Sequence, residues 1–226
     1  MISLRPLAAQ LRIRRTDLDG GVIIDSLRRL GKDLCQMSLG WKVNVTAQAL
    51  TSGVALQTPS IPAQTINSQS ITVEPIRITH FEVQVQSGGP YQGVRPMDAA
   101  ALDTNPNVRP NNGTPSRYID RFGSFELWPA PSSALLYNAT FAVSPTGEFD
   151  YLPFAQEFEE AFIEGALELI YAIDGAKMNL SLADYHGRRY AYRRNRMLAA
   201  VQATSGSPQM STPTMIPRQR SLVRYY

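Results

Sequence analysis

The most chemically distinctive stretch of this sequence is rich in arginine and tyrosine. From Tyr185 to Tyr226 it carries eight arginines and no lysine, aspartate or glutamate. The first part of the stretch contains Arg188, Arg189, Arg193, Arg194, Arg196, Tyr185, Tyr190 and Tyr192. Guanidinium groups pair with phosphates and aromatic rings stack on bases, so this composition suits nucleic acid. It suits a protein interface equally well, because Arg and Tyr are enriched at interface hot spots.

A block of acidic residues precedes this basic stretch. No Lys or Arg interrupts the sequence between Glu148 and Asp174. Adjacent carboxylates such as Glu159 and Glu160 could serve as a general acid and a general base, but neighbouring residues of a helix point about 100° apart. We therefore interpret the block as a solvated or intersubunit face.

Other motifs of catalysis and metal binding are missing from the sequence. It has no GxSxG elbow and no glycine-rich phosphate loop followed by Lys-Ser or Lys-Thr. His80 and His186 lie far apart without HExxH or CxxC partners. The single cysteine, Cys35, excludes an intramolecular disulfide and sits in an apolar pattern that predicts a small buried residue rather than a reactive thiol. We expect no enzymatic activity, no cofactor and no metal.

The composition is that of an ordinary soluble protein. The chain has 226 residues, 43% of them hydrophobic, which allows one sizeable core or two modest subdomains. The net charge is only +3, and without the eight C-terminal arginines acidic residues would outnumber basic ones. The first fifteen residues lack a signal-peptide core, and no apolar run of transmembrane length follows. We expect a soluble protein without its own export signal and without a membrane partner.

Hydrophobic periodicity predicts three helices that must position these side chains. Residues 22–39 carry apolar positions at steps of three and four, with Asp19 and Gly20 at the start and Gly40 at the end. Residues 154–174 combine an apolar and an acidic stripe. Residues 181–201 open with an apparent capping box of Ser181 and Asp184. The face of this helix that we expect to be partly buried carries Leu182, Tyr185, Arg189, Tyr192, Arg193, Arg196 and Ala200.

The middle of the chain reads as strands and loops. Trp41, Val43 and Val45 alternate, and the polar stretch 46–70 predicts short strands and loops. Pro75 predicts an edge strand or a bulge, because proline cannot donate to a ladder. Segment 88–116 predicts a loop with a short helix near 96–102, and 125–143 predicts a hairpin that turns at 129–133.

These elements predict an α+β fold with a mainly antiparallel β part. The expected division is a helical body from 1–40 and 150–201, a β-rich part from 41–149, and an extended, flexible tail from 202–226. The tail is punctuated by Pro208, Pro213 and Pro217.

The two C-terminal helices suggest how copies of the chain could assemble. If they form an antiparallel pair, a ring can set the acidic face of one copy against the basic face of the next. The residues expected at this intersubunit contact are Glu157, Glu160, Glu164, Glu168, Arg189, Tyr192, Arg193 and Arg196. In the alternative, the two faces meet inside one chain, where each exposed ion pair contributes about 0–1 kcal/mol. A charge-matched ring should dissociate as salt rises, whereas an internal pair should keep its mass.

The order of the segments resembles a known family. The quoted segments are IIDSLRRLGKDLCQMSLGWKV, PSRYIDRFGSFELWPAPSSALLYNATFAVSPT and LPFAQEFEEAFIEGALELIYAIDGAKMNLSLADYHGRRY. Together they resemble the head-to-tail adaptor (connector) proteins of tailed bacteriophages, similar to the tail tubular protein A group of short-tailed phages. The resemblance covers roughly residues 22–201.

The resemblance implies a structural virion protein of the neck or tail, present in the host cytoplasm during assembly. It implies a homo-oligomeric ring, usually of twelve subunits, with helices towards the portal and the β part towards the tail nozzle or next tail protein. Duplex DNA would pass through the lumen, which should hold it loosely, so we expect the arginine-rich helix to face mainly protein. We expect the tail to dock on the portal through Arg218, Arg220, Arg224, Tyr225 and Tyr226. A nucleic-acid-binding module and another tail-tube or stopper component remain the alternatives.

Overall fold

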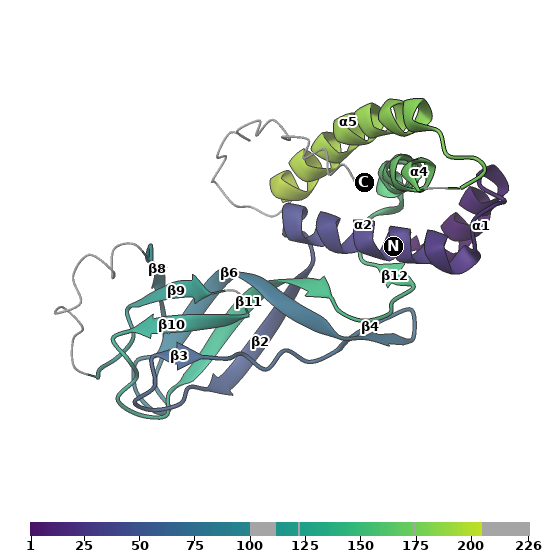
Figure 1. Cartoon of the computed structure of the whole chain (residues 1–226). Helices are drawn as coiled ribbons and strands as arrows, with labels where there is room; N and C mark the ends of the chain where they lie inside the picture. Colours follow the sequence, from purple (N-terminus) through teal and green to yellow (C-terminus); the bar gives the residue numbers. More distant parts are fainter. Residues whose placement is uncertain (100–111, 122, 174, 205–226) are drawn as a thin grey trace, which may run out of the picture.

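The fold of the computed structural model is α+β, as predicted, and the structure describes residues 1–99, 112–121, 123–173 and 175–204. The helices are α1 (Leu4–Arg14), α2 (Gly20–Ser38), the short 3₁₀ helix η2 (Gln156–Phe158), α4 (Glu159–Ala172) and α5 (Leu180–Thr204). Figure 1 shows them gathered at one end of the molecule, with most strands at the other.

The described strands form two four-stranded sheets and two small ladders. The first sheet has the order β2 (Lys42–Ala49), β11 (Leu136–Pro145), β6 (Val73–Gln84), β7 (Tyr91–Gly93). The second has the order β3 (Leu56–Gln57), β10 (Ser124–Trp128), β9 (Arg117–Arg121), β8 (Arg95–Pro96). The ladders are β1 (Ile2–Ser3) with β12 (Tyr151–Leu152) and β4 (Gln64–Ile66) with β5 (Gln69–Ile71). Among these strands, β8 and β9 pair in parallel and the other pairs are antiparallel.

The hairpin predicted over 125–143 is wrong. Its two strands exist as β10 and β11, but they belong to different sheets. β10 pairs with β9 across a tight turn that includes Gly123, whose φ of 77° favours glycine.

The short helix predicted near 96–102 is not seen in 96–99, and the rest of that segment lies outside the described residues.

An aromatic cluster joins the two sheets. Phe81 of the first sheet lies 5.0 Å from Phe125 of the second, measured between ring centroids, and 5.4 Å from Tyr118. Tyr137 and Phe141 of β11 complete the cluster. Aromatic pairs at these separations add to the free energy of burial, so this cluster is the centre of the β part.

Strand β11 connects the β part with the helices. Its first half alternates between buried and half-exposed residues, whereas all residues from Phe141 to Pro145 are buried. A strand buried on both faces must be covered on both, and α2 packs on β11. Opposite Val143, the ladder shifts register at Pro75, which confirms the predicted bulge.

Helix α4 lies between α2 and α5 (Figure 1), and half of its residues are buried, Phe162 and Ile170 among them. The capping box predicted at Ser181 is wrong. The start of α5 is capped instead by Asn179, whose side-chain oxygen accepts a hydrogen bond from the Leu182 backbone N–H at 3.0 Å. Helix α5 also continues past Val201 to Thr204.

The first forty residues contain two helices rather than the single one predicted. Leu4, Leu7 and Leu11 of α1 are buried at helical spacing. Pro6 lies in the first helical turn, where a missing N–H leaves no internal hydrogen bond unmade. The spacing of these leucines was a signal from which α1 could have been predicted.

Candidate functional site

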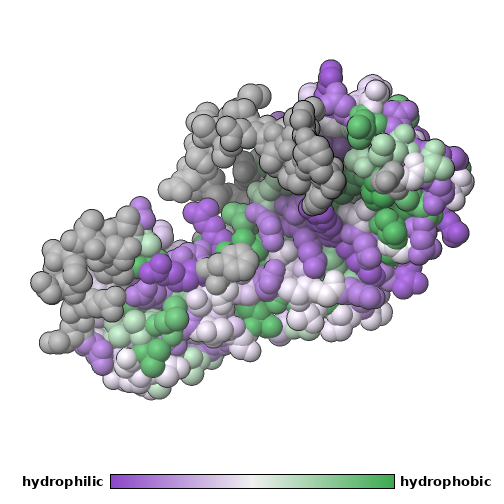
Figure 2. Space-filling view, in the orientation of Figure 1, coloured by the Kyte–Doolittle hydropathy of each residue, from purple (hydrophilic) through white to green (hydrophobic). Residues whose placement is uncertain are grey.

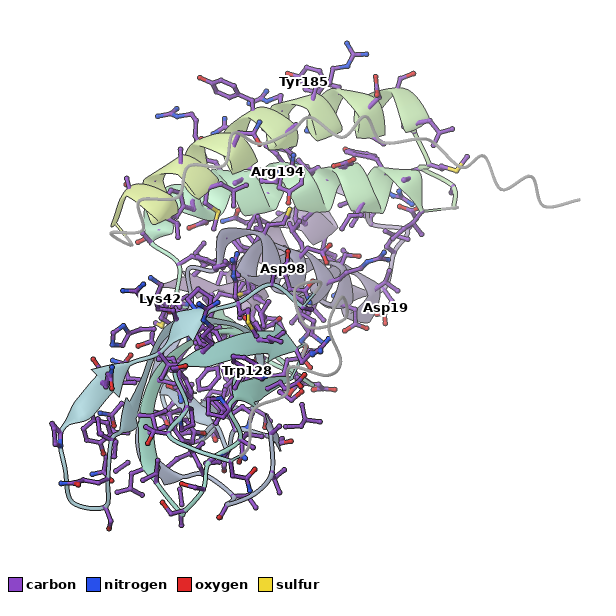
Figure 3. The ribbon with its side chains drawn as sticks, turned by 90° about the vertical axis from the view of Figure 1, so that its left-hand side faces the viewer. Asp19, Lys42, Asp98, Trp128, Tyr185 and Arg194 are labelled. Atoms are coloured by element: carbon purple, nitrogen blue, oxygen red, sulfur yellow. The ribbon has the colours of Figure 1, made fainter. Side chains whose placement is uncertain are left out.

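Helix α5 presents Tyr185, Arg188, Tyr192 and Arg196 on its exposed side, whereas Arg189 and Arg193 reach the glutamates of α4 and Tyr190 is buried. Its buried residues are Ala183, His186, Tyr190 and Met197. The face that we expected to be partly buried is a different one, and it is largely exposed, with Tyr185 at 51% and Tyr192 at 66%. Figure 3 shows Tyr185 on the outer side of α5.

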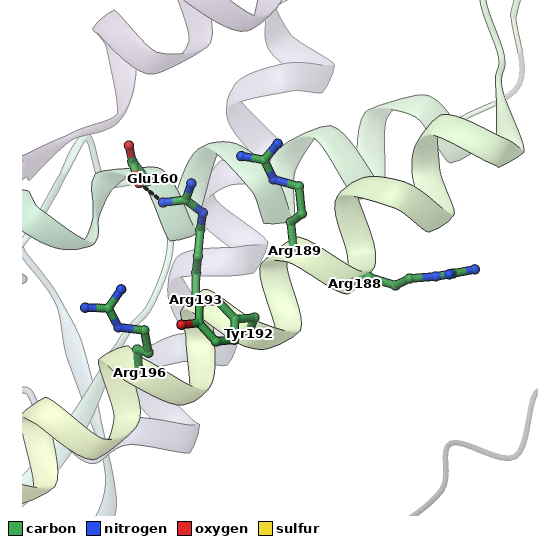
Figure 4. A pocket seen from close by; sticks show the side chains of 6 residues that line it. All are labelled: Glu160, Arg188, Arg189, Tyr192, Arg193 and Arg196. Carbon is green, nitrogen blue, oxygen red and sulfur yellow. Dashed lines mark ion pairs between the residues drawn. The ribbon is translucent and has the colours of Figure 1, made fainter.

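The exposed face forms a continuous candidate interface. We call it the Arg-Tyr surface and define it as Tyr185, Arg188, Arg189, Tyr192, Arg193 and Arg196. A shallow hollow of about 510 Å³ lies over it, lined by five of these residues and by Glu160 of α4 (Figure 4). The hollow is open to solvent, and its neighbour along the helix is lined by Glu157, Arg196 and Ala200 among others.

Three arginines of this surface already have carboxylate partners in the same chain. Arg193 forms an ion pair with Glu160, drawn as a dashed line in Figure 4. Arg189 Nε lies 2.9 Å from Glu164 Oε1. Arg188 pairs with Asp184, one turn earlier on α5, at 2.5 Å. The charge of the surface is therefore partly balanced before any partner arrives.

Glu164 is the centre of a buried polar cluster between α4 and α5. Its side chain is 9% exposed, and Oε2 lies 2.7 Å from His186 Nδ1. The His186 ring stacks on Tyr171 at 5.7 Å between centroids. A buried carboxylate requires such partners, because desolvation without them is costly. Glu164 therefore fixes how the two helices sit against each other.

Tyr185 and Arg189 support one another at the outer edge of the cluster. Arg189 donates a hydrogen bond from Nη1 to Tyr185 Oη at 2.8 Å, and its guanidinium carbon lies 5.5 Å from the ring centroid. This hydrogen bond, together with the charge of Glu164, raises the pKa of Arg189. Arg189 is thus a permanent cation held in a defined position.

The structure brings most of the predicted intersubunit residues together within one chain. Glu160 and Glu164 contact Arg193 and Arg189, as the intrachain alternative required. Glu157 lies exposed beside them, and Glu168 is half-buried next to Gly187. Contact between any of these residues and a neighbouring subunit stays a prediction. The tail residues Arg218, Arg220, Arg224, Tyr225 and Tyr226 lie outside the described residues.

The single cysteine and one of the two histidines lie away from the Arg-Tyr surface. Cys35 is buried in α2, and burial raises the pKa of its thiol to about 12. His80 is exposed on β6, 3.0 Å from Glu82. Among the described residues, no group of three or more His, Cys, Asp or Glu side chains could hold a metal ion. No helix in the same ranges is long and apolar enough to cross a bilayer.

Comparison with known proteins identifies the family of the chain. A search of curated proteins finds no match to the chain. The model of a family described as SU10 adaptor protein matches residues 3–215, nearly the whole sequence. The chain belongs to the SU10 adaptor protein family. The match includes both the β part and the helical end with its Arg-Tyr surface.

Membership of the SU10 adaptor family confirms the broader part of the resemblance described above. The protein is a bacteriophage adaptor, a structural component of the virion. The narrower likeness to the tail tubular protein A group stays a prediction. An adaptor acts by binding, so an exposed surface rich in Arg and Tyr is where its function is to be sought.

Proposed function

We propose that this SU10 adaptor protein forms a homo-oligomeric ring at the neck of the virion. The ring binds the portal protein on one side and the tail nozzle or next tail protein on the other. It extends the channel through which duplex DNA passes, and no bond is made or broken. The resemblance noted above leads us to expect twelve subunits. The polar stretch 46–70, with its short strands, belongs to the β part and would face either the tail or a neighbouring subunit.

The exposure of the Arg-Tyr surface is the observation that carries this proposal. Tyr192 is 66% exposed and the Arg188 side chain 81% exposed in the single chain. Tyr and Arg supply a large share of binding free energy when a partner covers them. An outward row of such residues on a helix that is itself firmly packed supports a rigid protein-binding surface.

The alternative of a nucleic-acid-binding module is less well supported. Arg188, Arg189 and Arg193 each pair with a carboxylate, so less net charge is left for phosphates. A DNA-binding monomer would show a steep loss of affinity with rising salt, because phosphate contacts release counterions. We expect weak DNA binding with a shallow salt slope.

The tail belongs to the same proposal. We expect residues 205–226 to dock on the portal, with Arg218, Arg220, Arg224, Tyr225 and Tyr226 as anchors. Truncation after Thr204 keeps all of α5 that the structure describes. The truncated protein should lose most of its portal affinity in a pull-down or titration. Undiminished binding would reject a role for the tail in docking.

Size and symmetry test the main proposal directly. Electron microscopy and native mass measurement should show closed rings of the full-length chain, alone or with purified portal. Order-of-addition experiments with portal and tail proteins separate an adaptor from a tail-tube or stopper component, which would require a previously bound ring. A chain that stays monomeric with every virion component would overturn the proposal.

A further inference from the structure

A second exposed row lies on α2 and matches the Arg-Tyr surface in spacing. Asp25, Arg29 and Asp33 follow one another at intervals of four residues, and all three are exposed. We call them the α2 row. Arg188, Tyr192 and Arg196 have the same spacing on α5, are equally exposed, and form the α5 row. Eight residues of helix rise about 12 Å, so the outer charges of each row stand about the same distance apart.

Each row lies on the side of its helix opposite to the buried residues. On α2 the buried side contains Ile23, Leu27 and Leu34, which are fully covered. On α5 it contains His186, Tyr190 and Met197. Residues four apart share a face, and with 3.6 residues per turn each row points away from its own buried side. Since α4 lies between α2 and α5 (Figure 1), the rows belong to different flanks of the helical end.

The charges of the two rows are complementary. The α5 row presents two cations around a central aromatic ring, and the α2 row presents two anions around a central cation. Pairing them sets Arg188 and Arg196 against Asp25 and Asp33, and sets the Arg29 guanidinium over the Tyr192 ring. An ion pair between Arg and a carboxylate and a cation–π contact are both favourable there.

The surroundings of the rows favour burial in an interface. Val22 and Met37, each 40% exposed, lie near the two ends of the α2 row, and Tyr185 lies one turn before the α5 row. Arg188 pairs locally with the exposed Asp184, and Asp25 is 73% exposed beside Arg28, whose own side chain is 16% exposed. Exposed pairs of this kind contribute about 0–1 kcal/mol, so they can be exchanged for contacts with another molecule. Figure 2 shows hydrophilic and apolar residues interspersed over one face of the molecule, including its helical end.

We propose that the α5 row of one subunit packs on the α2 row of a second copy of this chain. The inference rests on the proposed ring and identifies the two surfaces that would form it. Because the surfaces differ, each copy uses one for each neighbour, and the contact continues from copy to copy until it closes. The acidic half of the contact is then α2, rather than the glutamates of α4 that are already paired within the chain.

Charge reversal in the full-length chain tests this pairing. Asp25→Arg with Asp33→Arg should reduce the assembled fraction at least tenfold, and so should Arg188→Glu with Arg196→Glu. All four changes in one chain should restore assembly, because every contact then regains opposite charges. Arg95→Glu with Arg117→Glu, exposed on β8 and β9, is the matched control and should assemble normally. Assembly is measured by native mass, with circular dichroism as the check on folding.

A crosslinking experiment tests the same pairing without charge reversal, in case the charge-reversed variants fold poorly. Arg29→Cys and Tyr192→Cys in one chain should form disulfides between copies under mild oxidation, giving a ladder of products beyond the dimer. Cys35 is fully buried and should not contribute. Moving one cysteine to Gln92, exposed on β7, should abolish the ladder.

The outcomes separate this inference from the proposed function. Rings that persist in both charge-reversed variants would overturn the pairing while leaving the ring in place. If the variants with a reversed α5 row form rings that no longer bind the portal, the α5 row binds the portal. This result would also overturn the proposed pairing of the two rows. Enhanced or unchanged assembly with loss of DNA binding would assign the row to nucleic acid. A wild-type chain that forms no assembly with portal present would overturn the ring and this pairing together.

Discussion

Val201 of α5 rests directly on the backbone of Gly40. A Cβ built on Gly40 would approach Val201 Cγ1 to 2.6 Å, closer than a normal contact allows. Gly40 was expected to end α2, but the residue that ends the helix in a left-handed conformation is Leu39, with a φ of 52°. Gly40 is therefore needed for close packing, at the point where α2 leads into the β part.

The first prediction follows from this contact. Gly40→Ala should lower the free energy of unfolding by about 1–3 kcal/mol, because overpacking forces neighbours apart. Combining it with Val201→Ala should recover part of the loss, since the clashing methyl group is removed. Urea denaturation measures both. Gly93→Ala, where an added Cβ meets nothing within 4 Å, is the control, and an equal loss there would refute the packing argument.

The second prediction concerns pH. Arg15 is fully buried, donates to the backbone oxygens of Ile170 and Ile173 at the end of α4, and pairs with Asp17 at 2.9 Å. The hydrogen bond from Arg15 lowers the pKa of Asp17 from 3.8 to about 2. The folded state thus binds fewer protons than the unfolded state, so this stabilisation is present above about pH 4 and is lost as the pH falls through about 2.

Asp17→Asn should accordingly flatten the loss of thermal stability between about pH 5 and about pH 2.5. The measurement is the melting temperature of wild type and variant across this range. Asp98→Asn, at an exposed aspartate outside both rows, should follow the wild-type curve. If the melting temperatures of wild type and Asp17→Asn change in parallel with pH, the contact with Arg15 does not lower the pKa of Asp17 in the folded state relative to the unfolded state.

The third prediction concerns the buried cluster of α4 and α5. Glu164→Ala should lower the free energy of unfolding by about 3–5 kcal/mol, because the buried His186 and the adjacent Arg189 lose their shared carboxylate. Glu157→Ala, on the exposed end of the same acidic block, should change it by no more than about 0.5 kcal/mol. Chemical denaturation of the two variants provides the comparison, and similar losses in both would contradict the structural role of Glu164.

The fourth prediction concerns the only cysteine. Burial raises the pKa of Cys35 to about 12, so the thiolate that reacts with alkylating reagents is scarce and covered. A maleimide reagent at neutral pH should leave the folded protein unlabelled and label it on addition of denaturant. Rapid labelling under native conditions would mean that α2 opens readily.

Local patterns predicted most elements but not their partners. The spacing of apolar residues in 22–39 and the alternation of Trp41, Val43 and Val45 correspond to α2 and β2, because both patterns arise from a single buried face. Strands β10 and β11 show equally clear alternation, yet nothing local states that they join different sheets. β10 pairs with its neighbour in sequence, β9, whereas β11 pairs with β6, which lies far away along the chain.

The candidate site was predicted in composition but not in orientation. The arginines and tyrosines of α5 were recognised, whereas its buried face was missed because it contains Ala183, His186 and Tyr190 rather than large aliphatic residues. Likewise, Glu164 carries no sign in the sequence that it is buried. Glu164 is buried because α4 packs between two other helices, and no local sequence pattern indicates this packing.

Strand β11 has a mechanical consequence. It runs without interruption from the aromatic cluster to the underside of α2, and Asp150, shortly after it, holds Arg5 of α1 at 2.6 Å and Arg28 of α2 at 3.4 Å. A force applied to the sheets is therefore transmitted to the helices through a hydrogen-bonded strand rather than through a flexible linker. Each subunit should therefore move as a rigid body. Conformational flexibility within an assembled particle should be located at the interfaces between subunits.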